Sequence, residues 1–220
     1  MNAKDVLAKL ATKGDAARRK HNTRYGAPEN QFGVKAGDLR ALAKTIRTDH
    51  ALALELWATG NVEAQFLAAL IMEPKRLTAS ELDKLTRTTT FAHVADWMNS
   101  YVVAKHPDKE ALREKWMASK ERWTARAGWN LTASGINKGA DGLDPAALLD
   151  RIEQELPTAR PEVQWTMNTT LGTIGIKHPR LRKRAVAIGE KIGLYKDWPV
   201  SKGCTPPYVP VWVEAMVKRG

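Results

Sequence analysis

Apolar residues recur at intervals of three and four along almost the whole chain, which is the spacing of one face of an α-helix. Alternating β-branched runs, which would predict strands, are scarce. Residues that start or stop helices stand at suitable places: Asp144-Pro145, Pro161 and Pro179 predict helix starts, and Gly193 predicts a helix end. The pattern therefore predicts an all-α protein of about eleven or twelve helices joined by short loops.

Three segments share one arrangement, in which a helix ends, a short polar turn follows and a second helix begins. They cover residues 55–72, 114–133 and 154–175. Such repeats are typical of α-solenoids of the HEAT type, in which helical pairs stack into a curved array and the second helices line the concave side. We expect one domain over residues 1–220, a curved solenoid of HEAT-like pairs with a concave basic surface. Residues 195–220 combine proline and glycine with aromatic residues, which predicts an ordered tail packed on this body.

The charge of the chain narrows the choice of partner. Its 220 residues include 35 Lys and Arg against 24 Asp and Glu, a net charge of +11. This excess favours a polyanionic partner, above all nucleic acid, although a basic protein without such a partner would show the same balance. The single cysteine, Cys204, excludes an internal disulfide and fits a reducing compartment. With neither a long apolar run nor a signal peptide in the sequence, we expect a cytoplasmic protein with no membrane partner. We also expect a monomer.

Motifs for metal and cofactor chemistry are missing from the sequence. The histidines are far apart, without an HxxxH or HxH pair, and there is one cysteine. The sequence contains no Walker loop, dinucleotide fingerprint or nucleophile elbow. GTIG at 172–175 lies inside a helical pattern, where it indicates close helix packing. We therefore expect neither a metal nor a cofactor.

One candidate for chemistry lies on the helical segment FAHVADWMNS, residues 91–100. Val94 and Met98 belong to its apolar stripe, and Asp96 lies about 200° round the helix from Val94. A carboxylate in this position usually belongs to a solvated helix face. Because Trp97 lies beside it on the edge of that face, the same pattern also fits the start of a binding cleft.

Two further helices place polar or aromatic side chains off their apolar stripes. In the helix from Pro161, Trp165 follows the stripe residue Val163 by two positions, as Asp96 follows Val94. The helix around residues 121–134 carries a polar row beside its stripe: Arg122, Arg126 and Asn130. If these are second helices of stacked pairs, one concave surface would carry a carboxylate, an arginine row and an exposed tryptophan. Such a groove would suit a charged, partly aromatic ligand, but unrelated surface residues would give the same pattern.

The chain resembles the AlkD-like DNA alkylation repair family of HEAT-like repeat proteins over most of its length. The resemblance is carried by YGAPENQFGVKAGDLRALAK (25–44), FAHVADWMNSYVVAKHP (91–107) and WTARAGWNL (123–131). It implies a concave surface that grips duplex DNA by its backbone without base flipping, and excision of cationic N3- or N7-alkylated purines. Within the resemblance, Asp96 corresponds to the catalytic Asp, and Arg126 corresponds to an Arg close to the phosphate of the lesion.

The chemistry implied by the resemblance suits a site with one carboxylate. An alkylated purine already carries positive charge and leaves without a general acid, so Asp96 would stabilise the oxocarbenium ion or orient a water molecule. Trp97 or Trp165 would contact the lesion nucleoside beside Arg126. Basic residues would hold the backbone phosphates: Lys35, Arg40, Lys44, Arg122, Lys177, Arg180, Arg182, Lys183 and Arg184. The resemblance thus implies a DNA glycosylase acting on alkylated double-stranded DNA.

The sequence departs from the family at two aromatic positions. Ala92 stands one turn before Asp96, where active members have Trp, and Thr169 stands where a second Trp occurs on the later helix. Trp165 lies one turn before Thr169 and could replace that second Trp. Two alternatives stay open: a non-catalytic binder of branched or damaged DNA on the same scaffold, and a helical solenoid whose groove takes a protein or peptide.

Overall fold

The computed structural model describes residues 1–219, which contain thirteen α-helices, three 3₁₀ helices and no strand. The all-α prediction is confirmed, with short loops between most helices. The chain divides into two compact units, Met1–Leu112 and Arg113–Gly220, which we call unit 1 and unit 2. Helix α8 (Lys109–Met117) crosses the boundary between them.

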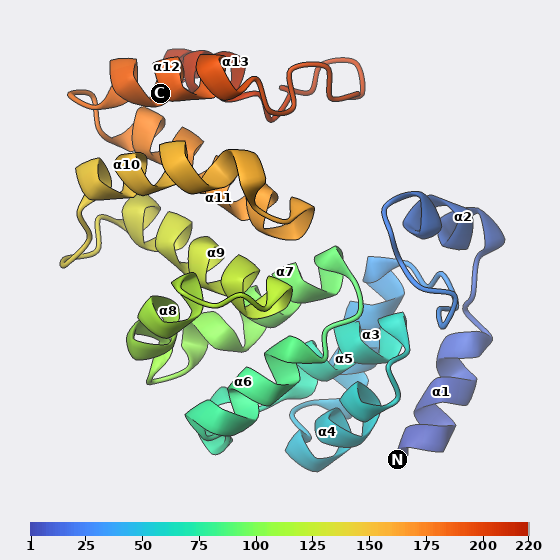
Figure 1. The fold of residues 1–220 in the computed structure, drawn as a ribbon. Helices are drawn as coiled ribbons and strands as arrows, with labels where there is room; N and C mark the ends of the chain where they lie inside the picture. The colour runs from blue at the N-terminus through green and yellow to red at the C-terminus, as the bar shows by residue number, and fades with distance from the viewer. Residues whose placement is uncertain (220) are drawn as a thin grey trace. The chain divides into compact units, whose positions relative to one another are not determined.

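Unit 1 is built around helix α5. Its sequence VEAQFLAALI is apolar on most sides, and the helix packs against α3, α4 and α7 (Figure 1). Helix α2 lies at the edge of the unit. The helices are α1 (Ala3–Ala11), α2 (Ala16–Arg24), α3 (Ala36–Ile46), α4 (His50–Ala58), α5 (Val62–Ile71), α6 (Ala79–Arg87) and α7 (Ala92–Tyr101), with 3₁₀ turns at Pro74–Arg76 and Val103–Lys105.

The amino end of α5 holds the segment that joins α2 to α3. Glu63 is 1% exposed, and its carboxylate accepts hydrogen bonds from the amides of residues 32–34 at 2.7, 2.8 and 3.3 Å. Asn61 caps α5 and donates to the side chain of Asn30 at 3.1 Å. These hydrogen bonds fix the segment after α2 on α5. The helix dipole adds to them, because a carboxylate is favoured at a helix amino terminus.

Unit 2 is built around helix α11, which packs against α9, α10, α12 and α13. Side chains of Trp129, Met167, Leu171 and Ile174 lie in its core. The helices are α9 (Arg122–Lys138), α10 (Pro145–Glu155), α11 (Pro161–Lys177), α12 (Arg182–Ile192) and α13 (Val209–Arg219), with a 3₁₀ turn at Leu156–Thr158.

The structure agrees with most of the predicted helix boundaries. Three are confirmed: Asp144 caps α10 with Pro145 as its first residue, Pro161 opens α11, and Gly193 ends α12 with a φ of 66°. The predicted start at Pro179 is wrong, because α12 begins at Arg182. A turn precedes the helix, closed by a 2.9 Å hydrogen bond from the Leu181 amide to the His178 carbonyl.

The three segments with a repeated pattern each contain the end of one helix and much or all of the next. They correspond to the pairs α4–α5, α8–α9 and α10–α11. Each second helix is rich in buried residues, which explains why the apolar positions of these helices occupy more than one narrow stripe. The predicted helical pairs are therefore present.

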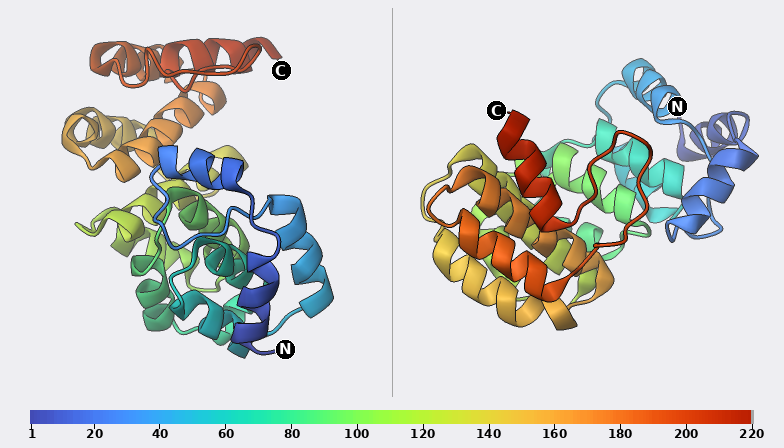
Figure 2. Two further views of the ribbon diagram at one scale, coloured as in Figure 1. Left: turned by 90° about the vertical axis from the view of Figure 1, so that its right-hand side faces the viewer. Right: turned by 90° about the horizontal axis from the view of Figure 1, so that it is seen from above.

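The segment predicted as an ordered tail contains helix α13. An extended loop, residues 194–208, connects it to α12 and projects beyond both helices (Figures 1 and 2). Gly172 and Gly175 of GTIG lie on α11 under α13. A Cβ atom added at Gly175 would stand 2.9 Å from a methyl group of Val213, and one added at Gly172 would overlap the ring of Trp212. The GTIG segment therefore serves helix packing, as predicted.

Replacing Gly172 by Ala is expected to destabilise unit 2, because the new methyl group would overlap the Trp212 ring. We expect the free energy of unfolding to fall by about 1–3 kcal/mol, measured by urea denaturation followed by circular dichroism. Gly37→Ala is the matched control, since nothing lies within 4 Å of the added atom on exposed α3, and a gain of up to about 1 kcal/mol is expected there. Equal stabilities of the two variants would contradict the packing of α13 on α11.

Candidate nucleic-acid interface

Asp96 lies half-buried on α7, at the margin between core and solvent. Val94 and Met98 of the same helix are fully buried, whereas His93 and Ser100 are exposed. The carboxylate therefore projects away from the apolar stripe, as the helical spacing predicts. Asp96 thus borders both the solvent and the low-dielectric core of unit 1.

Trp97, the neighbour of Asp96, packs between helices. Its ring centroid lies 4.7 Å from that of Phe66 and 5.6 Å from that of Tyr101, and the Arg40 guanidinium lies 4.8 Å above the ring. These contacts join α3, α5 and α7, so much of the indole surface serves the fold. A hollow of about 110 Å³ beside Trp97 is also lined by Arg18 of α2.

Helix α2 is a basic element that the sequence analysis did not single out. Its sequence AARRKHNTR follows the cap Asp15 and buries Asn22. Its exposed cationic side chains are Arg18, Arg19, Lys20 and Arg24. The signal in the sequence is the run RRKH within a helix too polar to bury an apolar face, which indicates a surface made for water or for a polyanion.

Aromatic rings accompany these cations. Tyr25, which directly follows α2, is 50% exposed, and its ring centroid lies 4.9 Å from that of His21 and 6.1 Å from that of His93. Hydrogen bonds fix the helix to the segment behind it, because Asn22 donates to Gln31 at 3.1 Å and Gln31 donates to the Thr23 hydroxyl at 3.1 Å. The basic helix is thus held by polar bonds to the segment that Glu63 anchors.

The predicted phosphate-binding residues of unit 1 are all exposed. Lys35 precedes α3, and Arg40 and Lys44 lie on α3. Lys35 stands 3.9 Å from the carboxylate of Asp15, an exposed ion pair that salt or a phosphate can displace at little cost. Helix α2 and the segment of Lys35 and α3 are therefore two successive basic segments of unit 1.

The predicted phosphate-binding residues of unit 2 fall into two groups. Arg122, Lys177, Arg180 and Lys183 are exposed. Arg182 instead donates to the carbonyls of Gly175 and Ile176, at 2.9 and 3.2 Å, and so satisfies the end of α11. Arg184 pairs with Asp150 and donates to the Ala146 carbonyl, which ties α12 to α10. These two side chains have structural partners, and their part in phosphate binding stays a prediction.

Arg126 is 3% exposed in unit 2. Its guanidinium donates to the carbonyl of Glu162 at 2.8 Å, and Arg122 one turn earlier forms a 3.2 Å ion pair with the Glu162 carboxylate. Both arginines therefore bind the first turn of α11, three residues before Trp165. Arg126 was predicted to lie in a polar row, but its burial was not predicted, because the burial depends on how α9 packs on α11.

Trp165 belongs to an aromatic cluster that includes residues of the loop before α13. Its ring centroid lies 5.3 Å from that of Tyr195 and 5.7 Å from that of Trp198. Burial raises the pKa of Tyr195 to about 12, while the positive charge of Arg126 acts in the opposite direction. The tryptophan that was expected to be exposed is thus half-buried, beside residues 195 and 198 of the loop between α12 and α13.

The structure brings Arg122, Arg126 and Trp165 together at the amino ends of α9 and α11. Asp96 and Trp97 lie in unit 1. The concave face shared by Asp96, Arg126 and Trp165 stays a prediction.

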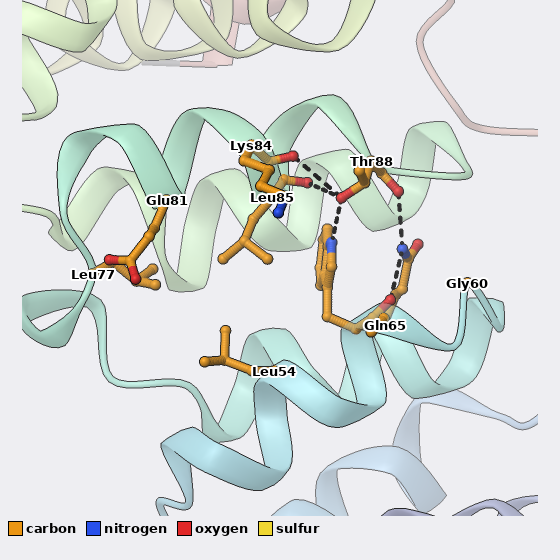
Figure 3. Close-up of a pocket in the computed structure, with 10 residues that line it drawn as sticks. Leu54, Gly60, Gln65, Leu77, Glu81, Lys84, Leu85 and Thr88 are labelled. Carbon is orange, nitrogen blue, oxygen red and sulfur yellow. Dashed lines mark hydrogen bonds between the residues drawn. The ribbon is translucent and has the colours of Figure 1, made fainter.

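Unit 1 also has a hollow of about 410 Å³, and neither Asp96 nor Trp97 lines it (Figure 3). Leu54, Leu77 and Leu85 supply apolar walls between α4 and α6. The Trp57 indole donates to the Thr88 hydroxyl at 2.9 Å on one side of it. Among residues 1–219 no helix is long and apolar enough to cross a membrane, and no group of three His, Cys, Asp or Glu could hold a metal ion.

Comparison with known proteins defines the fold class and then the family. A solved structure from "a new family of proteins related to the HEAT-like repeat DNA glycosylases with affinity for branched DNA structures" matches with a TM-score of 0.83 at 24% identity, covering 100% of this chain and 95% of that one. The fold is therefore HEAT-like, as predicted. The DNA alkylation repair enzyme family matches residues 6–194, and the chain belongs to that family.

Two bacterial relatives have similar sequences. The uncharacterized protein Lin0241 of Listeria innocua is 25% identical over 175 residues, which are 77% of this chain and 76% of the relative. The uncharacterized protein Lmo0209 of Listeria monocytogenes is 24% identical with the same coverage. The predicted family resemblance is confirmed by the family match.

Replacing Tyr195 by Phe is expected to change how stability depends on pH. Folding favours the neutral phenol of Tyr195, because burial raises its pKa from 10.0 to about 12. The contribution of the neutral phenol to stability is therefore complete below pH 10 and is lost as the pH rises towards 12. The variant should lose less thermal stability over that interval than the wild type, in melting curves at matched ionic strength. Tyr25→Phe, at a 50% exposed position, is the control and should follow the wild type. Parallel curves for all three proteins would contradict the burial of Tyr195.

Proposed function

We propose that the chain is a cytoplasmic DNA alkylation repair protein that binds DNA and hydrolyses the N-glycosidic bond of cationic N3- or N7-alkylated purines. The observation that carries this proposal is the half-buried Asp96 on α7, within the part of the chain that matches the family. A carboxylate between core and solvent can stabilise positive charge more strongly than one in bulk water.

Exposed cations support DNA as the partner. Helix α2 alone presents four Arg and Lys side chains, and the exposed residues Lys35, Arg40 and Lys44 follow it in the chain. In unit 2, Arg122, Lys177, Arg180 and Lys183 are exposed. Side chains of this kind bind phosphates without reading sequence, which gives an affinity that falls steeply with salt. The affinity of the structural neighbour for branched DNA is consistent with such a surface.

The proposed reaction needs little from the protein. The C1′–N9 bond breaks and its electron pair moves to the base, which thereby loses its positive charge and leaves as a neutral purine. The sugar becomes an oxocarbenium ion, which the Asp96 carboxylate stabilises. Water then adds to C1′ and gives up a proton, to Asp96 or to solvent, which leaves an abasic sugar. No general acid is required, because the base is already cationic.

A second candidate is binding of branched DNA without excision. The observation that favours it is the surroundings of Asp96, where Ala92 offers no ring and Trp97 is packed against Phe66 and covered by Arg40. Helix α7 therefore supplies little free aromatic surface for a cationic base. The structural neighbour with affinity for branched DNA points the same way.

Excision is tested with duplex DNA that contains 7-methylguanine or 3-methyladenine. We expect the wild type to release free base and Asp96→Asn to release it about a hundredfold more slowly, because the variant loses the charge that stabilises the oxocarbenium ion. Both proteins should bind the duplex equally. Asp141→Asn, the same chemical change in an exposed loop, is the matched control and should behave as wild type.

The remaining outcomes separate the candidates. Wild-type release no faster than in buffer would remove the excision claim, and tighter binding to a four-way junction than to a duplex would then support the second candidate. Equal release by wild type and Asp96→Asn would show that Asp96 is not catalytic. Failure to bind any DNA would leave the peptide-binding solenoid as the remaining interpretation.

A further inference from the structure

A hollow of about 360 Å³ in unit 2 is walled by three tryptophans. Helix α11 supplies Trp165, and helix α13 supplies Trp212. The loop between α12 and α13 supplies Trp198. The other lining residues are Asn168, Thr169, Val200, Thr205, Pro206 and Pro207. We call this hollow the tryptophan pocket.

The walls of the pocket are held in place. Tyr195 supports two of them, with its ring centroid 5.3 Å from that of Trp165 and 5.1 Å from that of Trp198. Asn168 donates to the Pro207 carbonyl at 2.9 Å and so fastens the loop to α11. The glycine at position 172 admits the Trp212 ring close to the helix backbone. The indoles are therefore preorganised, which lowers the entropic cost of binding a ligand between them.

The chemistry of the walls favours a planar, electron-poor or cationic ring system. Trp198 is 37% exposed, so part of its indole is available to a ligand although aromatic surface is normally covered. Bases of nucleic acids stack on such indoles whatever their sequence. Thr169 and Thr205 add hydroxyl groups to the lining, and their oxygen atoms can accept hydrogen bonds from the edge of a base.

Positive charge adjoins the pocket. Arg219 donates to the hydroxyl of Thr205, a lining residue, at 3.4 Å. Lys196 and Lys202 are exposed on the same loop as Trp198, beside one exposed acid, Asp197. A recess lined by indoles, with cations nearby, matches a nucleotide, because the base can stack on an indole and the phosphate can pair with a cation. A proline-rich peptide could use the rings but would gain nothing from the cations.

Much of the tryptophan pocket comes from residues outside the family match. The match ends at residue 194, whereas Trp198, Trp212 and the rest of the loop wall lie beyond it. The pocket is thus an addition to the part of the chain that defines the family. It does not depend on Asp96, which lies in unit 1.

We propose that the tryptophan pocket binds an already unpaired nucleobase of DNA, as at a single-stranded flap or branch, by stacking it on the exposed part of the Trp198 indole, with Trp165 and Trp212 as the other aromatic walls. This inference rests on the DNA binding proposed above but requires no base excision. The pocket would give the chain a preference for DNA with unpaired bases over a continuous duplex. The phosphates beside the bound base would lie near Arg219 and the loop lysines.

The test uses the full chain and a duplex with a short single-stranded flap that carries 2-aminopurine at an unpaired position. Wild type should bind the flap DNA more tightly than the blunt duplex and quench 2-aminopurine fluorescence by stacking. Trp198→Ala should weaken flap binding about tenfold, abolish the quenching and leave blunt-duplex affinity unchanged. Trp198→Phe should restore part of both effects. Met216→Ala, at an exposed position on α13, is the control and should match wild type.

Other outcomes would overturn the proposal. If wild type shows neither flap preference nor quenching, or if Trp198→Ala weakens flap and blunt DNA equally, the pocket does not bind an unpaired base, while duplex binding and excision remain open. If wild type binds no DNA, the proposed function is wrong, and the pocket is then tested by itself. Binding of free deoxyadenosine monophosphate is compared with binding of ribose 5-phosphate, which has no base. Selective binding of the nucleotide that is lost in Trp198→Ala would support it, and equal or absent binding would overturn it.

Discussion

The buried carboxylate of Glu63 is the constraint on which the amino-terminal half of the protein depends. A carboxylate that is 1% exposed would destabilise the fold unless hydrogen bonds replaced its water, and the three amides of residues 32–34 do so. Its position at the start of α5 adds a favourable interaction with the helix dipole. These bonds draw the segment after α2 onto the central helix of unit 1 and thereby fix where the basic helix lies.

This constraint also explains a stretch of sequence that carries the family resemblance. Residues 25–44 include the exposed Tyr25, the Gly33 backbone at a φ of 82°, and the exposed Arg40. Gly33 is required for two reasons: its backbone is left-handed, and a Cβ atom there would overlap the Asp15 carbonyl and Arg19. This stretch thus contains both residues of the proposed binding surface and residues that hold that surface in place.

In unit 2, close packing between helices determines where the polar and aromatic side chains lie. A Cβ added at Gly128 of α9 would lie 2.7 Å from the Met117 backbone nitrogen, so the first and second helices of this pair touch along their backbones. Arg126, two residues before Gly128, is buried and binds the first turn of α11. The same helix α11 accepts α13 over its glycines, which places Trp212 at the tryptophan pocket. Packing thus decides which polar and aromatic groups of unit 2 remain accessible.

Local patterns predicted the features that depend on neighbours in sequence. Apolar spacing predicted the helical pairs, capping residues predicted the starts of α10 and α11, and the angle from Val94 predicted the direction of Asp96. Features that depend on distant residues were missed or incomplete. The burial of Arg126, the packing of Trp97 on Phe66 and the tryptophan pocket all arise from contacts between helices. Helix α13 was expected as part of a tail because Pro210 and the proline-rich loop before it obscured its helical spacing.

Salt dependence of DNA binding tests the central claim most directly, namely that exposed cations hold DNA phosphates. Affinity for a blunt duplex would be measured over a range of KCl concentrations for wild type and for a variant in which the α2 cations become Gln: Arg18, Arg19, Lys20 and Arg24. A control variant loses the same charge from exposed lysines elsewhere in unit 1: Lys4, Lys9, Lys75 and Lys84.

We expect a linear fall of log affinity with log salt for wild type, with a slope of about −0.9 for each phosphate contacted. The α2 variant should show a distinctly shallower slope, and the control variant should keep a slope close to that of wild type. A wild-type slope near zero, or equal slopes for the α2 and control variants, would contradict the central claim.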